Sequence, residues 1–91
     1  MSEIIIKSLC NPIRLKIIQC LANKDKTVSE LISTCNLSQS AVSQHLIKLK
    51  NAGLVKDTKS GREIIYSITD KNLVTISNLI INLGKDSKKW K

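Results

Sequence analysis

The chain has 91 residues, and its 15 Lys and Arg against 7 Asp and Glu give a formal net charge of +8. This length favours one domain with a modest core, and a hydrophobic content of 42% excludes a disordered chain. A small domain this basic attracts polyanions, so nucleic acid is the first candidate partner and an anionic membrane surface is the second.

Membrane insertion and export are not expected. No apolar run approaches the ~18–20 residues that a membrane span needs. The opening residues, MSE, lack the basic n-region of a signal peptide. We therefore expect a cytoplasmic protein.

The first part of the chain predicts three helices. "SEIIIKSLC" favours a first helix of about two turns. Asn11 is a good N-cap for the second, with Pro12 at the first helical position, where its missing N–H costs nothing. Thr27 and Glu30 form a capping box at the start of the third, which ends near Asn36, a residue that tolerates left-handed conformations.

A fourth helix follows at once. Ser38 is its expected N-cap, and Gly53 supplies its C-terminal stop. Val42, Leu46 and Leu49 fall at i, i+4 and i+7, so they form its buried stripe.

After Gly53 the hydrophobic period changes to that of strands. "LVKDTKSGREIIYSIT" contains two strand-like runs separated by "TKSGR". Ile64, Tyr66 and Ile68 alternate and are expected on one face. Residues 59–62 are predicted as the hairpin tip, with Gly61 free to take a positive φ.

Asp70 is the expected cap of a last helix, and Gly84 its expected end. The apolar stripe of that helix consists of Leu73, Ile76, Ile80 and Leu83, and it is widened by Leu79 and Ile81. We expect residues 1–84 to form one DNA-binding domain and residues 85–91 to form a basic, disordered tail. The predicted fold is mainly α with a small β-hairpin, a winged helix-turn-helix of order α-α-α-α-β-β-α.

The exposed side of the fourth helix carries the candidate DNA-binding residues. Gln39 lies in its first turn, where an amide can pair with adenine. The polar residues of this region are Ser38, Gln39, Ser40, Ser43, Gln44 and His45. Lys48 suits phosphate contact, and Lys59 and Arg62 at the wing suit the backbone or the minor groove. Between Gln39 and Arg62 the only acid is Asp57.

Three segments resemble the ArsR/SmtB-type family of bacterial repressors. "SLCNPIRLKIIQCL" resembles the opening of that family, "TVSELISTCNLSQSAVSQHLIKLKNAGLV" its helix-turn-helix, and "KSGREIIYSIT" its wing. The resemblance runs from about Ser8 to Thr69. It implies a homodimer formed through the first and last helices, with one recognition helix per subunit on a palindromic operator in double-stranded DNA. It also implies repression of the protein's own operon until an inducer arrives.

The metal sites of the family are not expected here. Many members bind metal through a Cys-x-Cys pair in the third helix, where this chain has Thr27 and Ser29. Others use Asp and His pairs on the last helix, which here carries neither beyond its cap, Asp70. Without clustered thiolate or imidazole ligands a tight zinc or copper site cannot be built, so we expect no metal and no cofactor.

A branch of the family typified by HlyU and BigR, which the helix-turn-helix resembles closely, senses oxidants or sulfane sulfur with two cysteines. Its second-helix cysteine falls where this chain has Gln19, one residue before Cys20, and the last helix here has no cysteine. Cys10 and Cys20 remain candidate redox thiols. Ten residues of mostly helix would separate them by ~15 Å, too far for a bridge. We expect all three cysteines, Cys35 included, to be buried free thiols and not a disulfide scaffold.

Other function classes fit less well. With one His, scattered cysteines and no paired carboxylates, no nucleophile has an evident base, so an enzyme is not expected. A membrane-surface binder would keep an apolar helix face exposed, whereas each apolar stripe here has an intramolecular use. A winged-helix protein-interaction module stays open as an alternative, as does a redox- or sulfide-responsive repressor.

Overall fold

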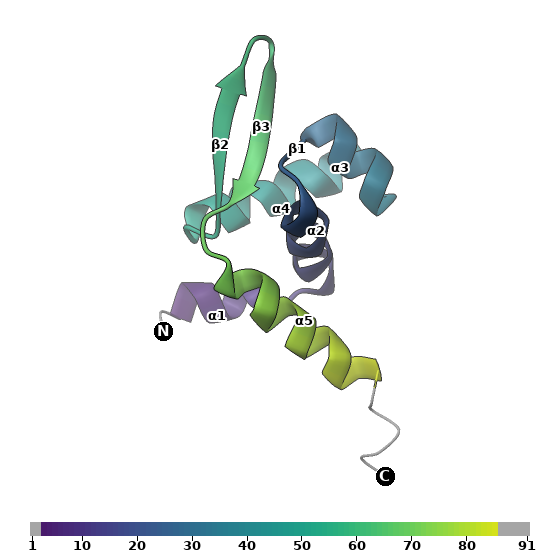
Figure 1. Ribbon diagram of the computed structural model, residues 1–91, viewed down its shortest axis with the longest axis vertical. Helices are drawn as coiled ribbons and strands as arrows, with labels where there is room; N and C mark the ends of the chain where they lie inside the picture. Colours follow the sequence, from purple (N-terminus) through teal and green to yellow (C-terminus); the bar gives the residue numbers. More distant parts are fainter. Residues whose placement is uncertain (1–2, 86–91) are drawn as a thin grey trace.

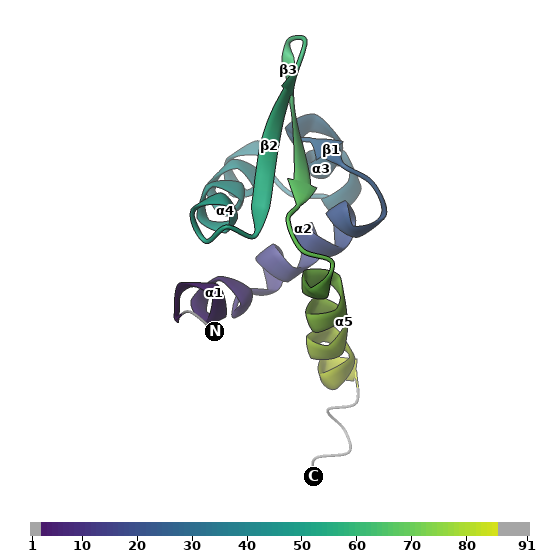
Figure 2. The same ribbon diagram turned by 60° about the vertical axis from the view of Figure 1, so that its left-hand side comes forward.

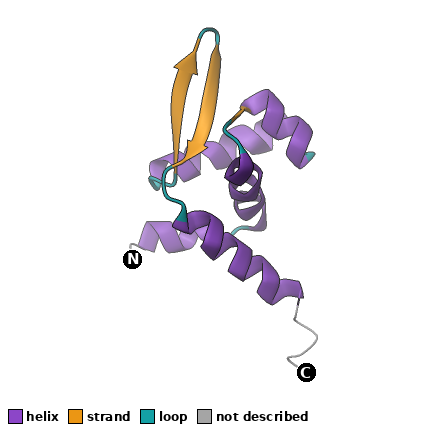
Figure 3. Cartoon of the chain, in the orientation of Figure 1, coloured by secondary structure: helices purple, strands orange, loops and turns teal. Residues whose placement is uncertain are grey.

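The computed structural model describes residues 3–85 of the chain (Figure 1). Within them the helices are α1 (Glu3–Leu9), α2 (Pro12–Asn23), α3 (Val28–Cys35), α4 (Gln39–Asn51) and α5 (Asn72–Lys85). The strands are β1 (Lys26–Thr27), β2 (Val55–Ser60) and β3 (Glu63–Ile68). The β2–β3 hairpin stands at one end of the molecule and the end of α5 at the other (Figures 1 and 3). The predicted winged helix-turn-helix is confirmed, with β1 as an addition.

The core lies where α2 meets α3, α4 and the base of the hairpin (Figure 2). As the lack of Phe requires, it is aliphatic. Its members are Leu9, Leu15, Ile17, Ile18, Leu21, Leu31, Cys35, Val42, Leu46, Leu49, Leu54, Val55 and Leu73. Packing of this kind, and not intrinsic propensity, holds short helices such as α3 in place.

Local sequence signals set the helix boundaries. Asn11 Oδ1 accepts hydrogen bonds from the Ile13 and Arg14 amides at 2.9 and 3.3 Å. The Thr27 amide donates to Glu30 Oε1 at 3.0 Å, and the Glu30 amide donates to Thr27 Oγ1 at 3.2 Å. These caps confirm the predicted starts of α2 and α3.

The sheet has three strands in the order β1-β3-β2, all antiparallel. Strand β1 was not predicted, because its two residues give no periodic signal. Ser60 pairs with Glu63, so Lys59 belongs to β2 and the turn is shorter than the predicted tip. Gly61 has the predicted positive φ, +63°.

Ile64, Tyr66 and Ile68 share one face of β3, as predicted, and Ile64 is 46% exposed where the hairpin extends beyond the body of the molecule. The prediction that the apolar stripe of the last helix is used within one chain is wrong in part. In α5, Leu73 is buried, but Leu79 and Leu83 are 60% and 58% exposed. The stripe of α5 therefore has only a partial use within one chain.

Helix α5 also runs through Gly84 to Lys85, so the predicted stop at Gly84 is wrong. A glycine inside a helix costs only about 1 kcal/mol relative to alanine, which flanking helical residues can offset. The predicted tail therefore begins inside a helix, and its remaining residues, 86–91, lie outside the described part of the chain. Within that part, no helix combines the length and the hydropathy of a membrane span.

The expectation of three buried free thiols is wrong. Cys10 lies in the connection between α1 and α2 and is exposed. Cys20 of α2 and Cys35 of α3 form a disulfide, with their Cα atoms 6.9 Å apart. They are 15 residues apart in sequence, and the packing of α3 against α2 brings them together.

Candidate nucleic-acid interface

The helix-turn-helix consists of α3, the turn 36–38 and α4. Asn36 ends α3 in the left-handed region, with φ 55°. Ser38 Oγ accepts a hydrogen bond from the Ala41 amide at 3.1 Å and starts α4. Val42 and Leu49 have no exposed surface, so one side of α4 is fixed to the core and the other must face outward.

The outward side of α4 is the one predicted from sequence. Its exposed residues are Gln39, Ser40, Gln44, Ile47 and Lys48, with Ser43 half-buried beside them and Ser38 exposed at the cap. Sequence reasoning missed Ile47, which is 59% exposed. An apolar residue off the buried stripe was the signal that could have found it, and such a side chain can contact a thymine methyl group.

His45 lies at the margin of this side, as predicted, and is tied to α2. Arg14 Nε donates to His45 Nδ1 at 3.3 Å. Burial lowers the pKa of His45 below its ordinary value near 6.5, and the positive charges of Arg14 and Lys48 lower it further. The imidazole is therefore neutral at pH 7. Arg14 was missed because its partner is 31 residues away in sequence.

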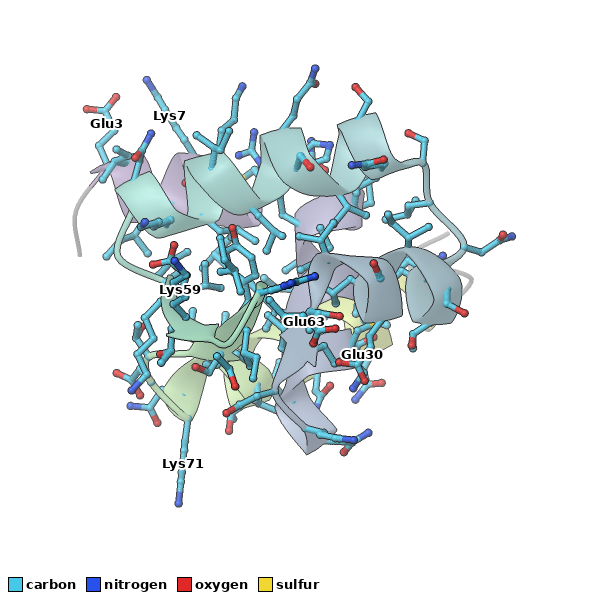
Figure 4. All side chains as sticks on the ribbon, turned by 90° about the horizontal axis from the view of Figure 1, so that it is seen from above. Glu3, Lys7, Glu30, Lys59, Glu63 and Lys71 are labelled. Carbon is cyan, nitrogen blue, oxygen red and sulfur yellow. A yellow bond between two sulfur atoms is a disulfide. The ribbon has the colours of Figure 1, made fainter. Side chains whose placement is uncertain are left out.

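The wing places its basic residues beyond the body of the domain. Lys59 and Arg62 are both exposed near the tip of the hairpin, and Figure 4, which looks down on the hairpin from above, labels Lys59 there. Lys50 Nζ lies 2.9 Å from Asp57 Oδ2, which joins α4 to β2. This hydrogen-bonded ion pair lowers the pKa of Asp57 and raises that of Lys50.

Residues 3–85 contain no cluster of metal-ligating side chains, and they lack the pair of cysteines of the HlyU and BigR branch. No group of three or more His, Cys, Asp or Glu gathers as metal ligands within this range. Gln19, at the position of the branch's second-helix cysteine, donates through Nε2 to Asn78 Oδ1 at 2.8 Å. A hydrogen bond thus links α2 to α5, the two helices that carry cysteines in that branch.

A sequence profile described as "Bacterial regulatory protein, arsR family" matches residues 11–57. The chain is also 34% identical over 84 residues to the HTH-type transcriptional repressor SmtB of Mycobacterium tuberculosis, a match that covers 91% of this chain. The chain belongs to the ArsR family. The match covers 62% of SmtB, so this chain spans less than two thirds of that relative.

Solved structures of ArsR-type regulators have the same fold. HlyU from Vibrio cholerae is 34% identical, with a TM-score of 0.76 over 88% of this chain and 87% of HlyU. The transcriptional repressor BigR from Xylella fastidiosa is 25% identical, with a TM-score of 0.79 over 88% of this chain and 82% of BigR. Membership in a family of regulatory proteins agrees with the expectation that this ArsR chain is not an enzyme.

Proposed function

We propose that this ArsR-family chain is a sequence-specific regulator of transcription that binds double-stranded DNA as a homodimeric repressor on a palindromic operator. The observation that carries the proposal is the outward side of α4, which is acid-free, polar except for Ile47, and anchored to the core by a fully buried stripe. A helix of this kind fits the major groove of B-DNA, where its N-terminal residues meet base edges.

Each part of this surface has a distinct task. Gln39 and Ser40, in the first turn of α4, read bases, and Gln44 follows one turn later. Lys48, Lys59 and Arg62 contact phosphates or the minor groove, which fixes the register without reading sequence in the major groove. The capped N-terminus of α4 adds backbone N–H groups to these contacts.

Exposed apolar residues on α1 and α5 support a homodimer. Ile4 and Ile6 of α1 are 53% and 49% exposed, and Leu79 and Leu83 of α5 are 60% and 58% exposed. Such surfaces mark interaction sites in soluble proteins. A two-fold axis through them would present two copies of α4 to successive major grooves, about 34 Å apart.

Repression is the simplest consequence of operator binding, because a bound dimer blocks access to the promoter. SmtB and BigR are named as repressors, whereas HlyU of Vibrio cholerae is named as an activator. A chromosomal operator also places the protein in the cytoplasm, where bacterial DNA lies.

Selection of bound fragments from random duplex DNA tests the proposal. We expect enrichment of a palindrome whose half-sites lie one helical turn apart, with binding that weakens steeply as salt rises. Enrichment of no sequence, together with an affinity indifferent to ionic strength, would contradict it and favour a protein-interaction module.

A second candidate function is a thiol-responsive repressor, which the Cys20–Cys35 disulfide favours. Disulfides in cytosolic proteins are usually transient or redox-sensing. A peroxide would oxidise the partly exposed Cys20 thiol to a sulfenic acid and release water. The buried Cys35 thiol would then attack that sulfur and release a second water, leaving the disulfide. Cys35 is the last residue of α3 and directly precedes the turn 36–38 into α4, so this bond restrains the start of the recognition helix.

Comparison of oxidised and reduced protein on the selected duplex tests this second function. We expect peroxide to change the affinity of the wild type and of Cys10→Ser, and not that of Cys20→Ser. An equal response of Cys20→Ser would assign the effect to another group.

A further inference from the structure

A basic hollow lies where α1, α2 and α4 meet, outside the base-reading residues. Its volume is about 390 Å³, and its lining consists of Ile4, Lys7, Ser8, Arg14, Lys48 and Asn51. Three different helices each contribute a cation, and none of the six lining residues is acidic. Glu3, one turn before Lys7, pairs with it at 3.1 Å on the exposed surface of α1.

Arg14 is held in the wall of this hollow by its own hydrogen bonds. Its Nη1 donates to the Lys7 and Ser8 carbonyl oxygens at 3.5 and 3.4 Å, and its Nε donates to His45 Nδ1 at 3.3 Å. Among the described residues Nη2 has no partner. A guanidinium fixed in this way is preorganised for an oxyanion, because little side-chain entropy remains to be lost.

The pKa of His45 reflects the positive charge around the hollow. Since Nδ1 accepts from Arg14, the neutral ring carries its proton on Nε2. The ring is half-buried, and the cations of Arg14 and Lys48 add to the effect of burial in lowering its pKa. Positive charge therefore remains in excess around the hollow, where Glu3 offsets only Lys7.

The hollow belongs to the side of the molecule that carries the recognition surface. In Figure 4, Lys7 projects in the same direction as the outward side chains of α4, whereas Lys71 projects in the opposite direction. An extended polyanion lying on α4 would therefore pass Lys7 and not Lys71.

We propose that the hollow between α1, α2 and α4 binds a backbone phosphate of the operator, held by Arg14, Lys7 and Lys48. This inference rests on the proposed function. It adds one phosphate contact per subunit near the C-terminal half of α4. It also makes Arg14 a residue that positions His45 and binds the duplex, linking α1 of the dimer surface to the recognition helix.

Binding of this phosphate also favours protonation of His45. The charged groups facing His45 are Arg14 from α2 and Lys48 from α4, and Lys7 of α1 lines the same hollow. A phosphate placed among them offsets the positive charge that disfavours protonation of the ring. The added proton takes Nδ1, so the hydrogen bond from Arg14 Nε is given up when the ring becomes charged. Binding of the duplex therefore raises the pKa of His45, and the affinity for DNA rises as pH falls through that raised pKa.

The first experiment uses His45 as a probe, since it is the only histidine in the chain. Imidazole NMR spectra would be recorded across pH for the free protein, with the selected duplex, and with inorganic phosphate. We expect the Nε2–H tautomer in the free protein and a titration shifted upwards by duplex far more than by inorganic phosphate. An unshifted titration with duplex, or an equal shift with inorganic phosphate, would overturn the proposal.

The second experiment uses charge-removing variants on duplexes with single neutral methylphosphonates. At one position per half-site, the methylphosphonate should lower the affinity of the wild type for the duplex. The same methylphosphonate should not change the affinity of Arg14→Gln or Lys48→Gln. Each variant should also reduce the slope of log affinity against log salt by about two per dimer. Lys71→Gln, a matched loss of charge on the opposite side, should behave as wild type. Lys7 is exposed and lies outside the proposed recognition surface, so Lys7→Gln, with the same expected changes, tests the site even if Arg14→Gln fails to fold.

The two proposals fail in different ways. Sequence-specific binding with unchanged salt slopes and unchanged methylphosphonate sensitivity in Arg14→Gln and Lys7→Gln would overturn the phosphate site alone. Absence of any duplex binding by the wild type would overturn the proposed function and this inference with it.

Discussion

Lys50 of the recognition helix and Asp57 of the wing form an ion pair with an N–O distance of 2.9 Å. The pair uses the only acid between Gln39 and Arg62, and it joins the two elements proposed to contact DNA. Lys50 is therefore less available for a phosphate than its place in the sequence indicates, and Asp57 repels the duplex less than an unpaired carboxylate would.

Replacing Asp57 by Asn should strengthen binding to any duplex, by roughly two- to fivefold at low salt, because a negative charge is lost and Lys50 is released. Fluorescence anisotropy with specific and random duplexes would measure the change. Asp25→Asn, an exposed acid in the loop before β1, is the matched control and should have little effect. Weaker binding by Asp57→Asn would mean that the pair positions the wing for DNA.

The same pair gives a pH dependence with a definite sign. The folded-state pKa of Asp57 lies below its ordinary value of 3.8. Its contribution to the free energy of unfolding is thus present above pH 4 and is lost as pH falls through the folded value. Urea unfolding should show a small, constant difference between wild type and Asp57→Asn from pH 7 to about 5, and a shrinking one below pH 4. A difference that grows on acidification would contradict the assignment.

Two variants should distinguish residues of the proposed interface that read bases from residues that contact DNA phosphates. Gln39→Ala should weaken operator binding by about 1–3 kcal/mol and relax specificity at one position, because an amide pair to a base is lost. Lys59→Ala should weaken all duplexes alike, because a phosphate contact carries no sequence information. Band-shift assays on the operator and on single-base variants would distinguish the two effects. A Gln39→Ala protein that matches wild type would remove Gln39 from the base-reading set.

Whether a feature of the fold could be predicted from the sequence depends on how far apart along the chain its interacting residues lie. Asn11, Thr27 and Ser38 were recognised because a cap bonds to an amide two or three residues away. The Arg14–His45 contact and the Cys20–Cys35 bond were not, because each requires the packing of two helices. Local periodicity specifies a helix and its faces, but it does not specify which faces meet.

The apolar stripe of α5 shows the same limit in another form. Its period correctly predicted a helix, yet the sequence did not distinguish burial within the chain from burial against a second copy. Leu73 is 4% exposed and Leu79 is 60% exposed, although both lie on the predicted stripe.

Leu79→Asp should disrupt the proposed dimer without unfolding the subunit, because the side chain is exposed in the single chain. We expect analytical ultracentrifugation to give a monomer at micromolar concentration, and operator affinity to fall at least tenfold. Ile64→Asp, which alters an exposed apolar residue of the wing, is the control and should remain dimeric. A Leu79→Asp protein that stays dimeric would place the interface elsewhere.

Ser77 of α5 is fully buried, and among the described residues its hydroxyl has no hydrogen-bond partner. Removing an unsatisfied buried polar atom relieves its desolvation penalty, and alanine also has the higher helix propensity. Ser77→Ala should therefore raise the free energy of unfolding by about 1 kcal/mol. Urea denaturation would measure it, with the exposed Thr75→Ala as a control for propensity alone. A less stable Ser77→Ala protein would contradict this assignment and show that the hydroxyl has a hydrogen-bond partner inside the folded subunit.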